Sequence, residues 1–158
     1  FQKEESPATD TTGERCGAGQ SGPVWFLAGN RDVGKVQREC VVPEGKSILV
    51  PIVYTVAQTK NNMPCDQIQV GIKKFMEGVS GLRFSLDGKD WNKFDQHHIG
   101  TGCFSLRDGE SGQTEIAAAN GYLILLPPLS KGRHIIKFGG RFKVDGFEQD
   151  VTYELTVR

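Results

Sequence analysis

The segment QDVTYELTV, residues 149–157, decides the fold class. Its apolar residues recur at every second position: Val151, Tyr153, Leu155 and Val157. The residues between them are polar. An apolar face that alternates with a polar face is typical of a strand whose sheet covers a core on one side and meets water on the other. The segment therefore favours a fold built from sheets packed in layers.

The rest of the chain repeats this pattern of short apolar runs separated by turn residues. Strands are predicted at residues 24–28, 36–42, 47–56, 82–86, 91–99, 102–106, 122–126 and 133–138. Many short strands with turn signals between them favour an antiparallel β-sandwich, of the jelly-roll or Ig-like type, over an α/β fold. The 20 glycines among 158 residues agree with this, because glycine is frequent in tight turns.

Glycine-containing dipeptides predict how later strands are joined. Asp87-Gly88 and Asn120-Gly121 predict two-residue type I′ turns, because such turns need positive φ angles that these residues tolerate. Gly139-Gly140 is expected to open a loop.

The first strands carry two further expectations. Residues 24–28 and 36–42 are expected to pair as a hairpin, because turn residues separate them. Pro51 lies inside the strand at residues 47–56 and predicts an edge position or a bulge, because proline cannot donate a backbone hydrogen bond.

One segment has a helical period. Its apolar residues recur three or four positions apart: Ile68, Ile72, Phe75 or Met76, and Val79, with Cys65 on the same stripe. Pro64 stands where a first helical turn would begin, and Gly78 stands where the helix would end. The sequence therefore predicts one short helix, residues 66–77.

The four cysteines contain no close Cys-x-x-Cys pair. An even number at this spacing favours two disulfides over zinc, and disulfides indicate an oxidising compartment. Four reduced, buried thiols in a cytosolic protein are the alternative. Cys16 lies just before the first predicted strand and Cys40 lies in the second, so we predict that they pair. Cys65 on the helical stripe is predicted to pair with Cys103 on a later strand.

The chain is predicted to form a single domain, residues 16–158, after a flexible polar tail, residues 1–15. The start at Phe1 is typical of a mature N-terminus after removal of a signal peptide, so we expect a secreted or periplasmic protein. Nineteen basic and 19 acidic side chains cancel, which gives no reason to expect nucleic acid as a partner. The longest apolar run, residues 48–53, is too short to cross a bilayer, so we expect no membrane insertion.

Several stretches resemble a group of uncharacterised secreted bacterial proteins. They are GPVWFLAG at residues 22–29, RECVVPEGK at 38–46, PLSKGRHIIKFGG at 128–140 and DVTYEL at 150–155. The first two form the more specific motif, because a proline-rich turn before a Gly-x-His strand is common in other β-sandwich modules. The resemblance implies export and a β-rich fold, and it carries no activity with it.

The candidate ligand-binding residues are Trp91, Asp95 and His97. Trp91 lies among polar residues, so its ring is expected at the surface, where it could stack on a sugar or anchor a protein partner. Packing at the edge of the core is the alternative for this ring. Asp95 and His97 would share one face of a strand, which permits a carboxylate–histidine pair. His98 would point the opposite way from His97, so the two histidines do not predict a metal site.

The sequence assigns no catalytic residue, metal or cofactor. It lacks a Gly-x-Ser-x-Gly elbow, a His-Glu-x-x-His pair and a phosphate-binding glycine loop. His134 is expected in the core or at its rim, bonded to the backbone. The stretch Asp108-Gly109-Glu110 is expected to be a solvated turn rather than a calcium site.

We therefore expect a secreted, non-catalytic binding or interaction module for an extracellular carbohydrate or protein surface. The alternative is a carbohydrate-active hydrolase, because its carboxylates can come from distant strands. The carboxylates available to such an enzyme include Glu39, Glu115, Glu148 and Asp150.

Overall fold

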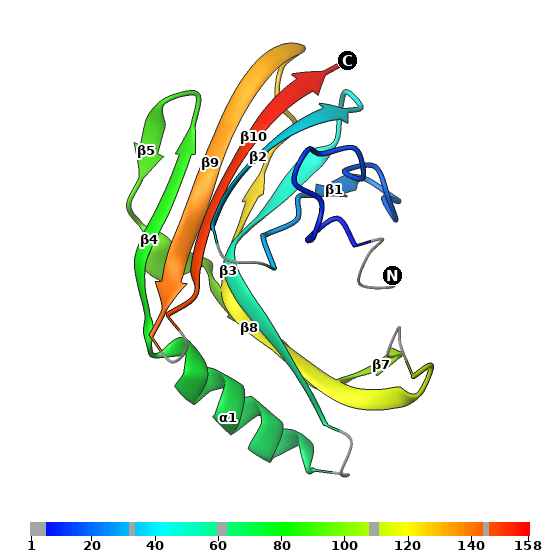
Figure 1. Cartoon of the computed structure of the whole chain (residues 1–158), viewed down its shortest axis with the longest axis vertical. Coiled ribbons are helices and arrows are strands. Elements are labelled where there is room, and N and C mark those ends of the chain that lie inside the picture. Colours follow the sequence, from blue (N-terminus) through cyan, green and yellow to red (C-terminus); the bar gives the residue numbers. More distant parts are fainter. Residues whose placement is uncertain (1–5, 32–33, 60–62, 108–110, 144–145) are drawn as a thin grey trace.

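Two β-sheets packed against each other form the body of the molecule (Figure 1). The computed structural model describes residues 6–31, 34–59, 63–107, 111–143 and 146–158. The first sheet has the order β1 (Val24–Phe26), β3 (Ser47–Thr59), β8 (Thr114–Leu126), β6 (His98–Gly100), and β7 (Phe104–Arg107) also pairs with β8. The second sheet has the order β2 (Gly34–Val42), β10 (Glu148–Val157), β9 (Gly132–Phe142), β4 (Val79–Leu86), β5 (Lys89–Trp91). With the helix α1 (Cys65–Met76), this arrangement confirms a mostly-β fold with a short helix.

The facing sides of the two sheets supply the core. Val50 and Ile52 of β3 are 0% exposed, and Val151 and Leu155 of β10 are at most 1% exposed. The alternation predicted for residues 149–157 is therefore confirmed. Full burial of such a side chain contributes about 1.5–3 kcal/mol, so contact between the layers is the main source of stability.

The sheets are mixed, whereas the sequence predicted an antiparallel sandwich. β1 pairs with β3 in parallel, and β2 pairs with β10 in parallel. The predicted hairpin between residues 24–28 and 36–42 is therefore wrong, because the two strands belong to different sheets. The connection between them is held by a distant strand: the backbone N–H of Asn30 donates to the side chain of Gln149 at 3.1 Å. The jelly-roll or Ig-like assignment stays a prediction.

One predicted two-residue turn is confirmed and the other is wrong. Asp87 and Gly88 join β4 to β5 with φ angles of 51° and 78°. Asn120 and Gly121 instead lie inside β8. A Cβ atom on Gly121 would lie 2.5 Å from the carbonyl oxygen of Val53, so this glycine permits a close approach of β3 rather than a turn.

Two further backbone predictions have opposite outcomes. Gly139 and Gly140 lie inside β9 rather than in a loop, and a Cβ on Gly139 would lie 1.9 Å from the carbonyl oxygen of Gln149. Close packing of β9 on β10 explains this glycine. The bulge expected at Pro51 is confirmed, because the pairing of β3 with β8 shifts register between Pro51 and Val53.

The single strand predicted at residues 91–99 is also wrong. β5 ends at Trp91, a 3₁₀ helix follows at Phe94–His97, and β6 then joins the other sheet. The segment between the Asp87-Gly88 turn and β6 thus carries the chain from one layer to the other.

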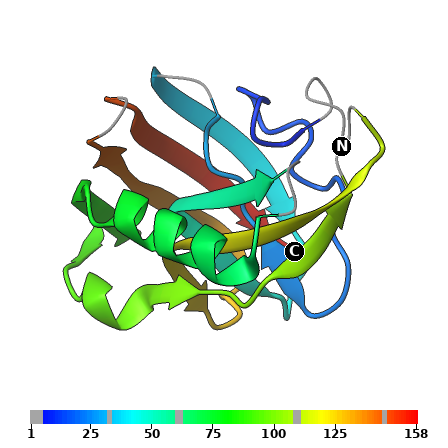
Figure 2. The ribbon, with the colours of Figure 1, turned by 90° about the horizontal axis from the view of Figure 1, so that it is seen from below.

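The predicted helix is confirmed within one residue at each end. Ile68, Ile72 and Met76 of α1 are buried, and Figure 2 shows the helix lying across β3 and β8. Both predicted disulfides are present: Cys16–Cys40 and Cys65–Cys103, the latter fastening the start of α1 to the segment before β7. Within the described ranges, no helix is long and apolar enough to cross a membrane.

The polar N-terminal segment packs on the domain from at least residue 10, so the tail expected up to Arg15 is wrong for this part. Asp10 is 8% exposed. Its carboxylate accepts hydrogen bonds from the backbone N–H groups of Thr12, Gly13 and Arg15 at 2.8–3.1 Å. Burial alone would raise the pKa of Asp10, but these hydrogen bonds outweigh it and lower the pKa to about 2.

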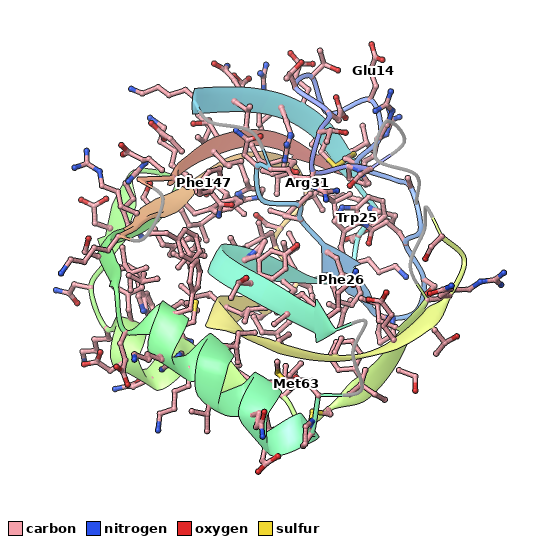
Figure 3. The ribbon with its side chains drawn as sticks, turned by 60° about the horizontal axis from the view of Figure 1, so that its bottom comes forward. Glu14, Trp25, Phe26, Arg31, Met63 and Phe147 are labelled. Carbon is pink, nitrogen blue, oxygen red and sulfur yellow. A yellow bond between two sulfur atoms is a disulfide. The ribbon has the colours of Figure 1, made fainter. Side chains whose placement is uncertain are left out.

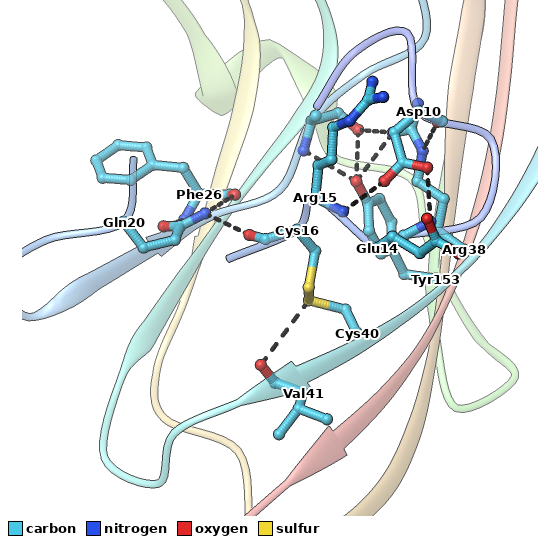
Figure 4. Close-up of a disulfide and its surroundings, with 12 residues drawn as sticks. Asp10, Glu14, Arg15, Cys16, Gln20, Phe26, Arg38, Cys40, Val41 and Tyr153 are labelled. Atoms are coloured by element: carbon cyan, nitrogen blue, oxygen red, sulfur yellow. Dashed lines mark hydrogen bonds between the residues drawn. A yellow bond between two sulfur atoms is a disulfide. The ribbon is translucent and has the colours of Figure 1, made fainter. Parts of the chain in front are cut away.

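The anchor for this segment is Arg38, a charged residue on the core-facing side of β2 that is 1% exposed (Figure 4). Its guanidinium donates five hydrogen bonds, to the carbonyl oxygens of Ala8, Asp10, Ala28 and Gly29 and to the hydroxyl of Tyr153, at 2.6–3.3 Å. We call Arg38, Tyr153 and Asp10 the Arg38 cluster. A buried cation is tolerated only when its donors are satisfied, and this one ties two loops to the sheet.

Candidate functional site

The second half of β3 runs away from the second sheet (Figure 1). A pocket of about 570 Å³ is lined by residues of this half and of the segments before β2 and β10. We call it the end pocket. Its aromatic and polar lining residues include Arg31, Tyr54, Gln58, Phe142 and Phe147. Figure 3 shows Arg31 and Phe147 on the side of β3 that is opposite α1. The volume lies within the range of small-molecule binding sites, roughly 300–1,000 Å³.

The second half of β3 forms one wall of the end pocket. Tyr54, Val56 and Gln58 alternate along this strand and are all exposed, whereas Val50 and Ile52 in its first half are fully buried. The same strand therefore changes function at its bulge. Val50 and Ile52 fill the core, and Tyr54, Val56 and Gln58 are exposed to solvent.

A buried amide fixes the base of the end pocket. Gln149 is 4% exposed, and its Nε2 donates to the carbonyl oxygen of Pro51 at 2.9 Å. Its Oε1 accepts from the backbone N–H of Asn30 at 3.1 Å. The side chain thus ties β10 to the bulge of β3 and to the loop that carries Arg31, so this base is rigid.

The loop that carries Arg31 is held by contacts at residues 28–31. Arg38 binds the carbonyl oxygens of Ala28 and Gly29, and the backbone N–H of Arg31 donates to the carbonyl oxygen of Ala8 at 3.1 Å. The side chain of Arg31 is exposed, and no described acidic group pairs with it. It is also the only charged residue among those described that line the end pocket.

Tyr54 lies in the electrostatic field of this arginine. Partial burial of its ring raises the pKa of Tyr54, and the positive charge of Arg31 acts in the opposite direction without cancelling the shift. The phenol therefore stays protonated at neutral pH. No described residue forms a hydrogen bond with the hydroxyl of Tyr54, which lines the end pocket.

The three residues predicted to bind a ligand are only partly brought together. Trp91 is 44% exposed, and its ring meets His97 edge-on with 5.7 Å between ring centres. Asp95 and His97 do not share a face of a strand, because both lie in the 3₁₀ helix. Because a 3₁₀ helix has three residues per turn, Asp95 and His97, two residues apart, point in directions that differ by about 240° around the helix axis. The Nε2 atom of His97 is buried without a partner among the described residues.

His134 belongs to a cluster that the sequence revealed only in part. Its Nε2 bonds to the carbonyl oxygen of Ser130 at 2.9 Å, which confirms the expected backbone bond, and its Nδ1 bonds to the Asp87 carboxylate at 2.7 Å. The hydrogen bond to Asp87 raises the pKa of His134. The Ser130 hydroxyl lies 3.4 Å from Nε2, so the three residue types of a hydrolytic triad are present. Nε2 engages a carbonyl oxygen, however, and an imidazole that donates from both nitrogens cannot act as a general base.

The carboxylates considered for hydrolysis are dispersed. Glu148 and Asp150 both pair with Arg83 on the surface, at 3.3 and 3.4 Å. Glu115 on β8 is 6% exposed, and neither of its carboxylate oxygens has a partner among the described residues. Nothing in the described part of the chain offsets the cost of burying this group.

A second, smaller pocket of about 390 Å³ lies over the Cys16–Cys40 disulfide. It is lined by Glu14, Glu39 and Glu154, with Arg133 beside them. Glu39 and Glu154 are direct neighbours on β2 and β10. Arg133 pairs with Glu154 at 3.1 Å, and Gln37 donates to the same carboxylate.

Metal binding has no candidate group within the described ranges, since no three His, Cys, Asp or Glu residues there lie close enough to hold an ion. Asp108-Gly109-Glu110 lies outside the described residues, so its expected turn stays a prediction.

Sequence reasoning missed the residues of the end pocket. Tyr54 was included in a predicted strand, and Arg31 in a turn. The spacing of Tyr54, Val56 and Gln58 predicts that the three residues share one face of a strand. It does not show whether this face is solvated or what lies opposite it.

No family model, curated protein or solved structure matches this chain.

Proposed function

We propose that this chain is a secreted or periplasmic, non-catalytic module that binds a carbohydrate in the end pocket. The observation that carries the proposal is the combination of aromatic rings with hydrogen-bonding side chains around one pocket of about 570 Å³. The two disulfides support an oxidising compartment.

The chemistry of a sugar ring corresponds to this lining. A pyranose has apolar C–H faces and a rim of hydroxyl groups. The rings of Tyr54 and Phe147 offer apolar surface, and the Arg31 guanidinium and the Tyr54 hydroxyl offer polar contacts. The rigid base around Gln149 keeps the cost of ordering the site low on binding.

Binding is favoured over hydrolysis at this site. Glycoside hydrolysis commonly uses a pair of carboxylates on either side of the bond. Among the described lining residues of the end pocket there is no Asp, Glu, His or Cys. Arg31 and Tyr54 can form hydrogen bonds with a sugar, but they do not supply a general acid and a general base at neutral pH.

A glycan array tests the proposal. The wild-type protein is expected to bind a limited set of glycans. Tyr54→Ala and Phe147→Ala are each expected to weaken that binding roughly tenfold or more, as for central contact residues. Trp91→Ala is the matched aromatic control, because its ring is also exposed but lies outside the pocket. Its binding is expected to stay within about twofold of wild type.

Two results would contradict the proposal. Loss of binding in Trp91→Ala, with Tyr54→Ala unaffected, would place the site at Trp91 and His97. Failure of the folded wild-type protein to bind any glycan at millimolar concentration would reject carbohydrate as the ligand. Circular dichroism of each variant controls for misfolding.

The alternative function, a carbohydrate-active hydrolase, is favoured by a different observation. Glu14, Glu39 and Glu154 line the smaller pocket. Glu39 is exposed and Glu154 is bound by Arg133, so the pocket lacks the water-excluded setting that hydrolases give to a proton donor. Release of reducing ends from a polysaccharide panel, abolished in Glu39→Gln, would support this alternative; no release is expected.

A further inference from the structure

We propose that the carbohydrate bound in the end pocket carries a carboxylate, as a uronic acid does, and that Arg31 binds this carboxylate. The inference rests on the proposed function and names the class of sugar. It follows from the positive charge of Arg31, the one charged residue among the described residues that line the pocket.

The positive charge in the end pocket is not neutralised by its described surroundings. Arg31 is the only charged residue among the described lining residues, and none of the ion pairs between described residues includes it. A guanidinium with its fork of donors open matches a carboxylate with two parallel hydrogen bonds.

The position of Arg31 is prepared before any ligand arrives. Its backbone N–H binds Ala8, and its neighbour Asn30 binds Gln149. Arg38 holds the preceding carbonyl groups of Ala28 and Gly29. A buried, fully bonded arginine thus fixes the loop that presents an exposed one. Because less backbone has to be ordered, more of the interaction is available for affinity.

Tyr54 supplies a second donor for the same anion. Tyr54 and Arg31 both line the end pocket. No described residue uses the Tyr54 hydroxyl. An ionised carboxylate accepts several hydrogen bonds, so the arginine and the phenol can bind it together. A neutral hydroxymethyl or amide group in the same place would forgo the charge-assisted part of this interaction.

The aromatic side of the pocket explains why the anion is expected on a ring rather than free. Phe142 and Phe147 pack against each other with 5.9 Å between ring centres, and both line the pocket with Tyr54. A free inorganic anion would leave this apolar surface uncovered. A uronic acid covers it with the face of its ring and directs its carboxylate toward Arg31.

The test compares acids with their own esters. Trisaccharides of galacturonate, glucuronate and mannuronate, and the methyl ester of each, are titrated by calorimetry into the full chain in low salt. The esters keep the ring and lose the charge. We expect at least one acid to bind roughly tenfold or more tightly than its ester, because the charge-assisted bonds are lost. We expect this preference to fall when the salt concentration rises.

Variants identify the group responsible. Arg31→Gln is expected to remove the preference for acid over ester while leaving ester binding unchanged, and Arg31→Lys to retain part of the preference, because lysine keeps the charge but not the fork. Arg158→Gln is the matched control, since this exposed arginine at the end of the chain lies outside the pocket. It is expected to behave as wild type.

Each remaining outcome decides a different point. Equal binding of acids and esters by the wild-type protein overturns the inference and leaves the proposed function in place. A preference for acid that persists in Arg31→Gln also overturns it, because another group would then read the charge. Binding of neutral glycans on the array without binding of any uronate again rejects the inference alone. Absence of binding to every sugar rejects the proposed function as well.

Discussion

Two arginines seven residues apart in the sequence have opposite environments. Arg38 is 1% exposed, and its guanidinium donates hydrogen bonds to five oxygen atoms of the protein. Arg31 is exposed, and its side chain has no described acidic partner. Two tyrosines differ in the same way. The hydroxyl of Tyr153 bonds to Arg38 and to Ala28, whereas that of Tyr54 has no partner among the described residues.

The contrast separates structural groups from groups available to a ligand. A buried polar group needs hydrogen-bond partners within the protein, and a group whose donors are all used in this way has none left for a ligand. The Arg38 cluster meets this condition, so its role is to hold two loops on the sheet. The end pocket contains Arg31 and Tyr54, whose side-chain donors have no partner among the described residues, and we propose that they bind a ligand.

The largest effect is expected from Arg38→Met. Loss of the guanidinium removes five buried hydrogen bonds. We therefore expect the free energy of unfolding to fall by about 3–5 kcal/mol. Urea denaturation measures it. Arg133→Met is the control, because Arg133 is an exposed side chain paired with Glu154. It should cost no more than about 1 kcal/mol. Equal losses in the two variants would mean that the Arg38 cluster does not hold the loops.

Acid should weaken the same cluster through Asp10. Its pKa falls from 3.8 to about 2 on folding. A group whose pKa is lowered in the folded state contributes stability above its unfolded pKa and loses it as the pH falls through the folded pKa. Stability is therefore expected to drop by about 2 kcal/mol between pH 5 and pH 2 on account of this residue. Asp10→Ala should lack this part of the decline. An identical decline in the variant would contradict the assignment.

A matched pair of tyrosine variants sharpens the comparison. Tyr153→Phe removes a hydroxyl that bonds to Arg38 at 2.9 Å, and we expect a loss of about 1–3 kcal/mol in stability. Tyr54→Phe removes a hydroxyl without a described partner, so its stability should change by less than about 0.5 kcal/mol. Glycan affinity should change in the reverse order. Thermal unfolding gives the change in stability, and calorimetry gives the change in glycan affinity. If the same variant had the larger effect on both, the distinction between structural and ligand-binding tyrosines would be refuted.

The smallest effect is expected at His134 and Asp87, outside both regions. The hydrogen bond to Asp87 raises the pKa of His134. The contribution of protonated His134 to the free energy of unfolding is therefore complete below about pH 6.5, and it is lost as the pH rises through the folded pKa. Burial alone would raise the pKa of Asp87, but the hydrogen bonds from His134 and from the backbone N–H of Ile135, together with nearby positive charge, outweigh it and lower the pKa. The contribution of Asp87 is therefore lost in acid, below its unfolded pKa of 3.8. His134→Gln should flatten the stability profile above pH 6 by about 0.5 kcal/mol. An unchanged profile would show that the pair is not coupled to folding.

Local patterns predicted those parts of the fold that local interactions determine. The alternation of β10, the stripe of α1 and the φ angles at Asp87-Gly88 each depend on neighbours in sequence. The Cys65–Cys103 pairing also followed from the helical stripe that carries Cys65. The Cys16–Cys40 pairing is present as predicted, although the hairpin that brought these two cysteines together in the prediction is wrong.

Contacts between distant segments account for the failures. Gly121 and Gly139 were interpreted as turn and loop residues, but each is required where another strand passes closely. Arg38 alternates with apolar residues on β2, and only the positions of Ala8 and Ala28 show what it binds. The end pocket combines loops, β3 and the segment before β10. No single stretch of sequence contains enough of it to be recognised.

The most direct test of the division is a nuclear magnetic resonance titration of the wild-type protein with the glycan that binds most tightly on the array. We expect the largest amide shifts at residues 29–31, 54–58 and 146–149. We expect no shifts for amides around Glu39 or around Trp91 and His97. Shifts centred on Trp91 and His97, or on the pocket that contains Glu39, would contradict the assignment of the end pocket as the binding site.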